Sequence, residues 1–146
     1  MKNIVFTTLV LLLSSFTASA ATSLTEDKIT AVAQQLVDFH KTEAVELLQK
    51  ILSPDLNVTV TQGSNGYGFV LNYTREEYID YLRKGHKSKF RVGTDVNYVS
   101  SEFLGNREAK FIVRYRSKQH NKYVWVEGFV KMVGNDVQIT HIEEYT

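Results

Sequence analysis

The chain has 146 residues, with 17 Lys and Arg against 16 Asp and Glu and a formal net charge of +1. This near balance gives no electrostatic reason to bind nucleic acid or an anionic membrane. Cysteine is absent, which excludes disulfides, thiolate metal sites and cysteine nucleophiles, so we expect one domain that is held together by packing alone.

Residues 1–20 have the three parts of a secretory signal peptide. Lys2 supplies the positive charge, residues 4–13 are mostly apolar, and Ala18-Ser19-Ala20 matches the small-residue cleavage pattern. The alternative is a membrane anchor, but the apolar stretch is much shorter than the roughly 20 residues that span a bilayer. We expect cleavage near Ala20, a mature domain over residues 21–146, and a periplasmic or secreted location.

Helical periodicity dominates the start of the mature chain. Ser23 and Glu26 have the spacing of a capping box, and the apolar residues that follow predict a helix to about His40. A second, shorter helix is predicted from Thr42 to a point before Pro54, because the residue before proline is pushed out of the helical region.

One strand, one loop and a third helix are predicted next. Residues 56–62 alternate apolar and polar side chains as in a strand, and residues 63–68 indicate a flexible loop. Thr74 and Glu77 then have the spacing of a second capping box, and Gly85 stands where the helix that they open is expected to end.

The remaining sequence predicts an antiparallel meander. Three turn signals separate four strand-like runs over residues 91–103, 109–117, 123–133 and 137–145. If every hairpin loop has an even number of residues, parity assigns each residue to one face of the sheet. The predicted core face holds Val92, Val96, Tyr98, Phe111, Val113, Tyr115, Val124, Val126, Val130, Met132, Val137 and Ile139. The opposite face holds Ile112, Arg114, Arg116, Tyr123, Trp125, Glu127, Phe129, Gln138, Thr140 and Ile142.

This order of elements, from Leu24 to Tyr145, resembles the nuclear transport factor 2-like (NTF2-like) superfamily. The resemblance includes the helix start TREEY at residues 74–78 and the ending ITHIEEY at residues 139–145. It implies an α+β domain, cone-shaped, with N-terminal helices packed in a curved antiparallel sheet. It also implies a cavity between helices and sheet, frequent dimers through the outer sheet face, and functions that range from catalysis to binding.

Polar side chains are expected to converge inside this cone. His141 and Glu143 share the parity of Ile139, and Gly128 leaves room beside His141. We therefore expect a ligand-binding group on the core face, made of Tyr98, Tyr115, His141 and Glu143. The alternative is that the last strand frays toward solvent and that His141 is a hydrogen-bonded core histidine.

The resemblance extends to ketosteroid isomerases and polyketide cyclases, but the isomerase mechanism does not carry over. Those isomerases imply an acid in the first strand and a tyrosine in a helix. Here residues 57–62 contain no acid, and Leu36 stands at the tyrosine position. No cofactor is predicted, and no metal either, because no two histidines have the spacing of metal ligands. The histidines are His40, His86, His120 and His141.

The outer face of the meander collects aromatic side chains. We expect an exposed apolar patch that forms a homodimer interface, made of Ile112, Arg114, Tyr123, Trp125 and Phe129. The alternative is a surface ladder complete in itself, in which Arg114 and Arg116 stack on Trp125 and Tyr123.

Two functions remain open at this point. The favoured one is an exported, non-catalytic domain that dimerises and holds a small apolar or aromatic molecule or a partner segment. The alternative is an enzyme of the same fold, of isomerase, cyclase or dehydratase type, in which His141 works with Tyr98, Tyr115 or Glu143. A catalytic pocket needs polar groups within hydrogen-bonding reach of one another, whereas a filled core would leave no cavity.

Overall fold

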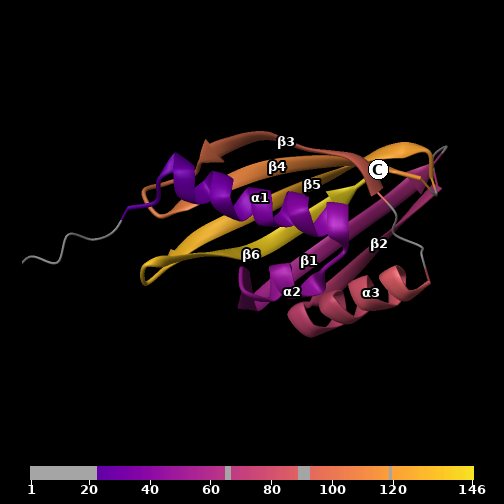
Figure 1. Cartoon of the computed structure of the whole chain (residues 1–146), viewed down its shortest axis with the longest axis horizontal. Coiled ribbons are helices and arrows are strands. Elements are labelled where there is room, and N and C mark those ends of the chain that lie inside the picture. Colours follow the sequence, from indigo (N-terminus) through magenta and orange to yellow (C-terminus); the bar gives the residue numbers. More distant parts are fainter. Residues whose placement is uncertain (1–22, 65–66, 89–92, 119) are drawn as a thin grey trace, which may run out of the picture.

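A computed structural model describes residues 23–64, 67–88, 93–118 and 120–146 (Figure 1). The signal peptide expected at residues 1–20 and the core residue expected at Val92 lie outside these ranges. None of the described helices is both long and apolar enough to cross a membrane. The elements are α1 (Glu26–Thr42), α2 (Val45–Gln49), β1 (Leu52–Ser64), β2 (Tyr67–Thr74), α3 (Arg75–Lys87), β3 (Gly93–Phe103), β4 (Glu108–Ser117), β5 (Lys122–Val133) and β6 (Asp136–Tyr145).

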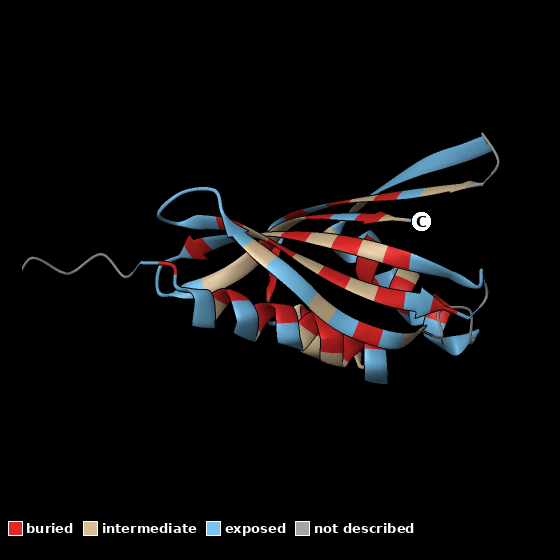
Figure 2. Ribbon diagram, turned by 90° about the horizontal axis from the view of Figure 1, so that it is seen from above, coloured by how far each residue is buried: buried red, intermediate tan, exposed pale blue. Residues whose placement is uncertain are grey.

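The strands form one sheet in the order β2-β1-β6-β5-β4-β3. β1 and β6 are parallel, and the other neighbours are antiparallel. Figure 1 shows the helices on one face of this sheet, and Figure 2 shows the sheet twisting over them. The predicted α+β class and the meander of four strands are confirmed.

The core lies between α1 and the inner face of the meander. Burial alternates along β4 and β5, as expected for a sheet with one covered face. The predicted core face is confirmed for Val96, Phe111, Val113, Tyr115, Val124, Val126, Val130, Met132 and Ile139, which are buried, and for Tyr98 and Val137, which are partly buried against them.

The last strand departs from the predicted pattern at Thr140. Phe129 pairs with His141, but Val130 pairs with Ile139, so Thr140 is an extra residue in β6. Such a bulge reverses the facing of every later side chain. Ile142 is therefore fully buried, although parity placed it on the opposite face, and the side chain of His141 points outward instead of into the cone.

Two further predictions about local structure are wrong. The expected loop at residues 63–68 is largely strand, because β1 and β2 pair continuously from Asn57↔Thr74 to Ser64↔Tyr67. The cap of α1 is Thr25, whose hydroxyl accepts a hydrogen bond from the Lys28 N–H at 3.4 Å, rather than Ser23.

The third helix confirms one prediction and corrects another. Its capping box is present, because the Thr74 N–H donates to Glu77 Oε2 at 2.9 Å and the Glu77 N–H donates to the Thr74 hydroxyl at 3.4 Å. Gly85, however, is a buried residue within α3, which continues to Lys87.

A glycine in β5 lets an aromatic ring fill the middle of the core. Gly128 pairs with Phe111, and a Cβ atom at Gly128 would lie 2.3 Å from Cζ of the Phe111 ring. Phe111 is fully buried, so its ring has little space in which to move away. Gly128 thus makes room for Phe111 and not, as the sequence suggested, for His141.

We therefore expect Gly128→Ala to lower the free energy of unfolding by about 1–3 kcal/mol, the usual cost of overpacking a core. Urea denaturation measures this loss. Gly105→Ala is the matched control, because nothing lies within 4 Å of a Cβ atom at that position. Equal stability of Gly128→Ala and wild type would contradict the prediction.

Candidate functional site

The structure places the expected ligand-binding residues on opposite faces of the sheet. Tyr98 and Tyr115 lie on the inner face, as predicted. His141 and Glu143 lie on the outer face because of the bulge at Thr140, with His141 Nε2 3.2 Å from Glu143 Oε1. The four residues therefore do not line a common cavity.

The inner face instead carries a polar cluster that the sequence analysis missed. The Tyr115 hydroxyl donates a hydrogen bond to Oε1 of Glu144 at 3.0 Å, and the ring of His40 stacks on Tyr115 with 4.4 Å between centroids. All three side chains are buried. His40 continues the apolar face of α1 in the sequence, which was a usable signal, whereas Glu144 faces inward only because of the bulge.

Almost no empty space adjoins this buried cluster. The nearest cavity measures about 10 Å³ and is lined by Phe39, His40, Glu43, Leu82 and Tyr115. That volume holds about one water molecule. Beside this cavity, Nδ1 of His86 contacts the carboxylate of Glu43. This contact joins α3 to the end of α1. The interior beside this buried cluster is therefore almost completely filled.

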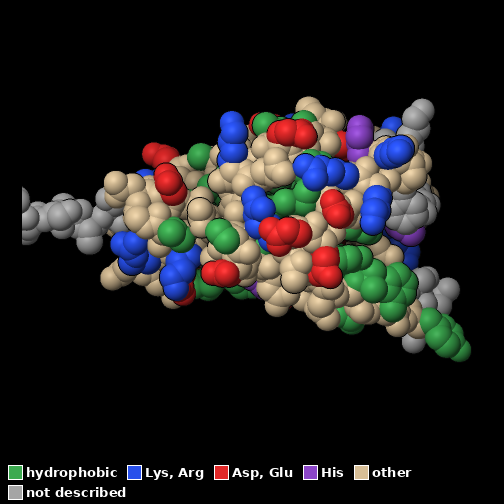
Figure 3. Space-filling model, turned by 90° about the horizontal axis from the view of Figure 1, so that it is seen from below, with side chains coloured by type: hydrophobic (Ala, Val, Ile, Leu, Met, Phe, Trp, Pro, Cys, Tyr) green, Lys and Arg blue, Asp and Glu red, His purple; other side chains and the backbone are tan. Residues whose placement is uncertain are grey.

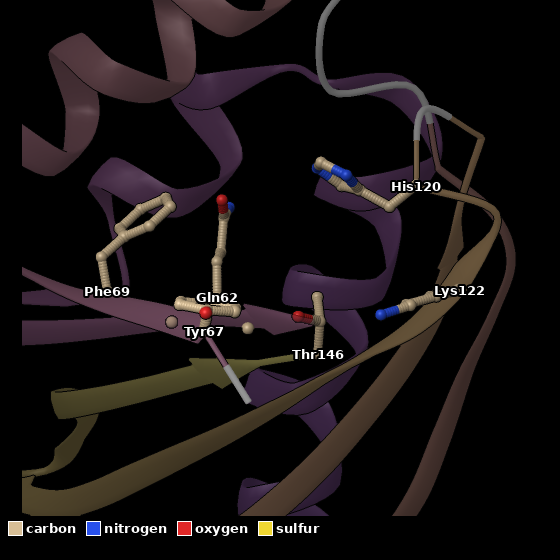
Figure 4. A pocket seen from close by; sticks show the side chains of 8 residues that line it. Gln62, Tyr67, Phe69, His120, Lys122 and Thr146 are labelled. Atoms are coloured by element: carbon tan, nitrogen blue, oxygen red, sulfur yellow. The ribbon is translucent and has the colours of Figure 1, made fainter. Parts of the chain in front are cut away.

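A much larger hollow opens at the rim of the sheet, between the β1–β2 hairpin and the turn from β4 to β5. We call it the rim cleft. It has a volume of about 520 Å³ and is lined by Gln62, Gly63, Tyr67, Gly68, Phe69, His120, Lys122 and Thr146. Figure 4 shows Tyr67 and Phe69 on one side of this space and His120 and Lys122 on the other.

The rim cleft combines two kinds of side chain. The exposed rings of Tyr67 and Phe69 supply apolar surface, and Lys122 and His120 supply hydrogen-bond donors. The amide of Gln62 stands between them in Figure 4. The lining residues include no Asp or Glu side chain. The cleft can therefore receive an apolar or aromatic body that carries one hydrogen-bond acceptor or one anionic group.

A second hollow lies at the opposite end of the sheet. It has a volume of about 750 Å³ and is lined by Ser23, Leu24, Phe103, Leu104, Gly105, Asn106 and Arg107. It lies in the turn between β3 and β4 and adjoins the beginning of the described chain. It offers fewer converging functional groups than the rim cleft.

The expected interface residues all lie on the outer face, where Arg114, Tyr123 and Trp125 make part of the ladder that was the alternative to an interface. The guanidinium carbon of Arg114 lies 4.4 Å from the Tyr123 ring centroid and 5.7 Å from that of Trp125. The Tyr123 hydroxyl donates to Asp95 at 2.7 Å. This bond is the main reason why the pKa of Asp95 is lowered, and it raises the pKa of Tyr123.

Polar contacts interrupt the apolar part of this face. Lys110 Nζ lies 3.5 Å from Oε2 of Glu127, and the Tyr145 hydroxyl donates a hydrogen bond to Oε1 of the same carboxylate at 3.0 Å. The pKa of Tyr145 is raised, mainly by burial and secondly by the hydrogen bond to Glu127. Ile112, Trp125 and Phe129 are only partly exposed. Dimerisation through this face stays a prediction.

No family model matches this sequence, and no curated protein matches it either. Similar solved structures include a DUF4783 family protein from Bacteroides ovatus, with 14% identity, 77% of this chain and 92% of that chain covered, and a TM-score of 0.57. An NTF-2 like protein of unknown function from Silicibacter pomeroyi is 14% identical, with 81% and 92% covered and a TM-score of 0.59. A domain of unknown function with a cystatin-like fold from Nostoc punctiforme is 13% identical, with 84% and 78% covered and a TM-score of 0.64.

At such identities the likeness shows the fold alone. It confirms the resemblance expected from the order of the elements in this chain. This chain therefore has the NTF2-like, cystatin-like cone fold.

Proposed function

We propose that this chain is an exported, non-catalytic binding domain that holds a small apolar or aromatic molecule in the rim cleft. The observation that carries the proposal is a contrast of volumes: about 10 Å³ beside the buried polar cluster against about 520 Å³ in the rim cleft. Binding sites for small molecules usually measure about 300–1,000 Å³. The rim cleft has this size, and the cavity beside the buried polar cluster does not.

The positions of the polar groups support a non-catalytic role. A general acid or base must come within about 2.6–3.2 Å of the proton that it transfers. Tyr115 and Glu144 are packed in the filled interior, and His141 and Glu143 lie on the other face of the sheet. None of these four lines the rim cleft, so the acid–base residues expected from the sequence are separate from the proposed ligand space.

The lining of the rim cleft supports the proposed class of ligand. The rings of Tyr67 and Phe69 are exposed, and a flat apolar ligand would cover part of their surface. Lys122 and His120, on the opposite side, would hold an acceptor or anionic group of the same molecule. The expected ligand is thus a small aromatic or aliphatic compound with one polar end.

Binding of anilinonaphthalene sulfonate, which has an aromatic body and an anionic group, tests the site. Loss of the Phe69 ring in Phe69→Ala should raise the Kd about three- to tenfold, the usual worth of one aromatic contact. Lys122→Gln should also weaken binding, and this effect should shrink at high salt. Fluorescence titration measures both.

Leu104→Ala is the matched control for this titration, because Leu104 is an exposed apolar residue in the other hollow. Its Kd should equal that of the wild type. A wild type that does not bind the probe, or a Leu104→Ala variant that loses as much affinity as Phe69→Ala, would refute the site.

The buried polar cluster should act on stability and not on binding. Tyr115→Phe removes the hydroxyl that donates to Glu144. We expect the free energy of unfolding to fall by about 1–3 kcal/mol, since the buried Glu144 carboxylate loses one hydrogen bond, while the affinity for the probe stays unchanged. Tyr123→Phe is the control on the outer face. The Tyr123 hydroxyl also donates to a carboxylate, but both residues are exposed, so its loss should cost less stability than Tyr115→Phe. Unchanged stability of Tyr115→Phe, with weaker probe binding, would favour a functional role for the cluster.

Export can be tested on the full-length chain expressed in a bacterium. We expect the protein recovered from the periplasm or the medium to begin within a few residues of Ala21, because the charged, apolar and small-residue segments follow the order of a signal peptide. Intact-mass spectrometry measures the N-terminus. Recovery from the cytoplasm with residues 1–20 retained would contradict the proposal.

A further inference from the structure

The β2 edge of the sheet carries an unusual amount of exposed apolar surface. β2 is one of the two edge strands, and its exposed fractions are 86% for Tyr67, 53% for Phe69, 57% for Val70 and 38% for Leu71. Figure 2 shows β2 exposed along most of its length, and Figure 3 shows apolar side chains gathered at this end of the molecule.

The other edge strand, β3, has the features that normally prevent strands of different chains from pairing. Its pairing with β4 is interrupted by two register shifts, and Asp95 has a positive φ of 52°. It also carries the charges of Asp95 and Glu102. Charges, bulges and twists of this kind protect sheet edges from added strands.

β2 has none of these protective features in its described residues. It pairs with β1 without a register shift from Tyr67 to Thr74, and this segment contains no charged residue and no proline. Its outer edge therefore offers a regular row of backbone donors and acceptors. Because the strand is uncharged, bringing two copies of it together costs no charge repulsion.

We propose that a second copy of this chain pairs antiparallel with the outer edge of β2, around a two-fold axis at Val70. Directly opposite residues in such a pair share a face of the sheet. Val70 then faces its own copy, Phe69 faces Leu71 of the partner subunit, and Tyr67 faces Tyr73 of the partner subunit. These three contacts join apolar or aromatic side chains, and the remaining pair joins Gly68 to Asn72 of the partner subunit.

The two neighbouring registers that keep the two-fold axis are less favourable. Pairing around Leu71 would place Val70 opposite Asn72 of the partner subunit, and pairing around Phe69 would join only residues 67–71 of each β2 strand. The register around Val70 therefore matches the strand to itself better, which is why the proposed occupant is a second copy and not an unrelated strand. This interface differs from the one expected around Trp125 and does not depend on ligand binding.

The pairing would also extend the rim cleft. Tyr67 and Phe69 line the cleft, and their opposite residues would be Tyr73 and Leu71 of the partner subunit. The apolar wall of the cleft would then continue from one subunit into the next.

Because the chain contains no cysteine, a single introduced cysteine reports only on contacts between copies. In Val70→Cys the two thiols should lie directly opposite each other, and mild oxidation or a short bismaleimide should convert most of the protein to a covalent dimer. Denaturing electrophoresis without reductant measures the yield.

Two control variants test the register of the proposed pairing and the choice of edge strand. In Asn72→Cys, on the same face of β2, the thiols would be about 13 Å apart along the strands, four residues at about 3.3 Å each, and cross-linking should be much slower. Val99→Cys places an exposed cysteine on the β3 edge and should remain monomeric on the gel. Cross-linking of either control as fast as Val70→Cys would overturn the proposal.

Sedimentation velocity on the uncross-linked protein provides the second test. The wild type should sediment as a dimer at tens of micromolar, and Val70→Lys, which places a charge on the two-fold axis, should raise the dimer Kd at least about tenfold. Val133→Lys, another exposed valine, and Trp125→Glu should stay dimeric. Circular dichroism confirms that each variant is folded.

Three further outcomes would overturn the β2 interface. The wild type could be monomeric at these concentrations, or Trp125→Glu could disrupt the dimer while Val70→Lys does not. The third is a β2 edge that binds a foreign peptide strand but not a second copy. A failure here leaves the probe titration of Phe69→Ala unaffected, so the interface and the ligand site can fail separately.

Discussion

The single extra residue in β6 determines which side chains lie inside this protein. At Thr140 the pairing with β5 shifts by one, and the Thr140 hydroxyl donates a hydrogen bond to the Phe129 carbonyl at 3.3 Å. After this point Ile142 and Glu144 enter the interior, whereas His141 and Glu143 leave it. The shift also brings Ile142 into register with Val58, so that both enter the core from neighbouring parallel strands.

The filled interior follows from this arrangement. Ile142 and Phe111 flank Gly128 in the sheet, and the Phe111 ring occupies the space that the glycine leaves. Further along, the buried Glu144 accepts a hydrogen bond from Tyr115, on which the His40 ring stacks, and only about 10 Å³ of empty space adjoins this group. The rim cleft, where we propose that a ligand binds, lies between the β1–β2 hairpin and the β4–β5 turn.

Much of the fold could be predicted from local sequence signals. Helical periodicity marked α1, the capping box at Thr74 and Glu77 marked the start of α3, and alternation with turn signals marked the four strands of the meander. These signals lie within a few residues of what they determine. The β1–β2 hairpin had such a signal too, because Asn65-Gly66 is typical of a two-residue hairpin connection, but the glycine-rich stretch was interpreted as a loop.

The candidate site depended on information that is not local. A bulge has no short sequence signature, and one extra residue was enough to place Tyr115 and His141 on opposite faces. The rim cleft combines Phe69, Lys122 and Thr146, which only the folded sheet brings together. The ladder on the outer face could be considered from the sequence, as the alternative to an interface, because Arg114 and Trp125 are directly opposite each other in a regular hairpin.

The position of β6 in the sheet also affects how the chain can fold. β6 is the last strand to be synthesised, yet it lies between β1 and β5 and pairs with β1 in parallel. Until residues 136–145 are available, the sheet consists of two halves, each with an unpaired inner strand. Such long-range pairing slows folding and leaves strand edges open in the meantime. A chain that lost its last ten residues would keep those two edges open permanently, and aggregation would be its expected fate.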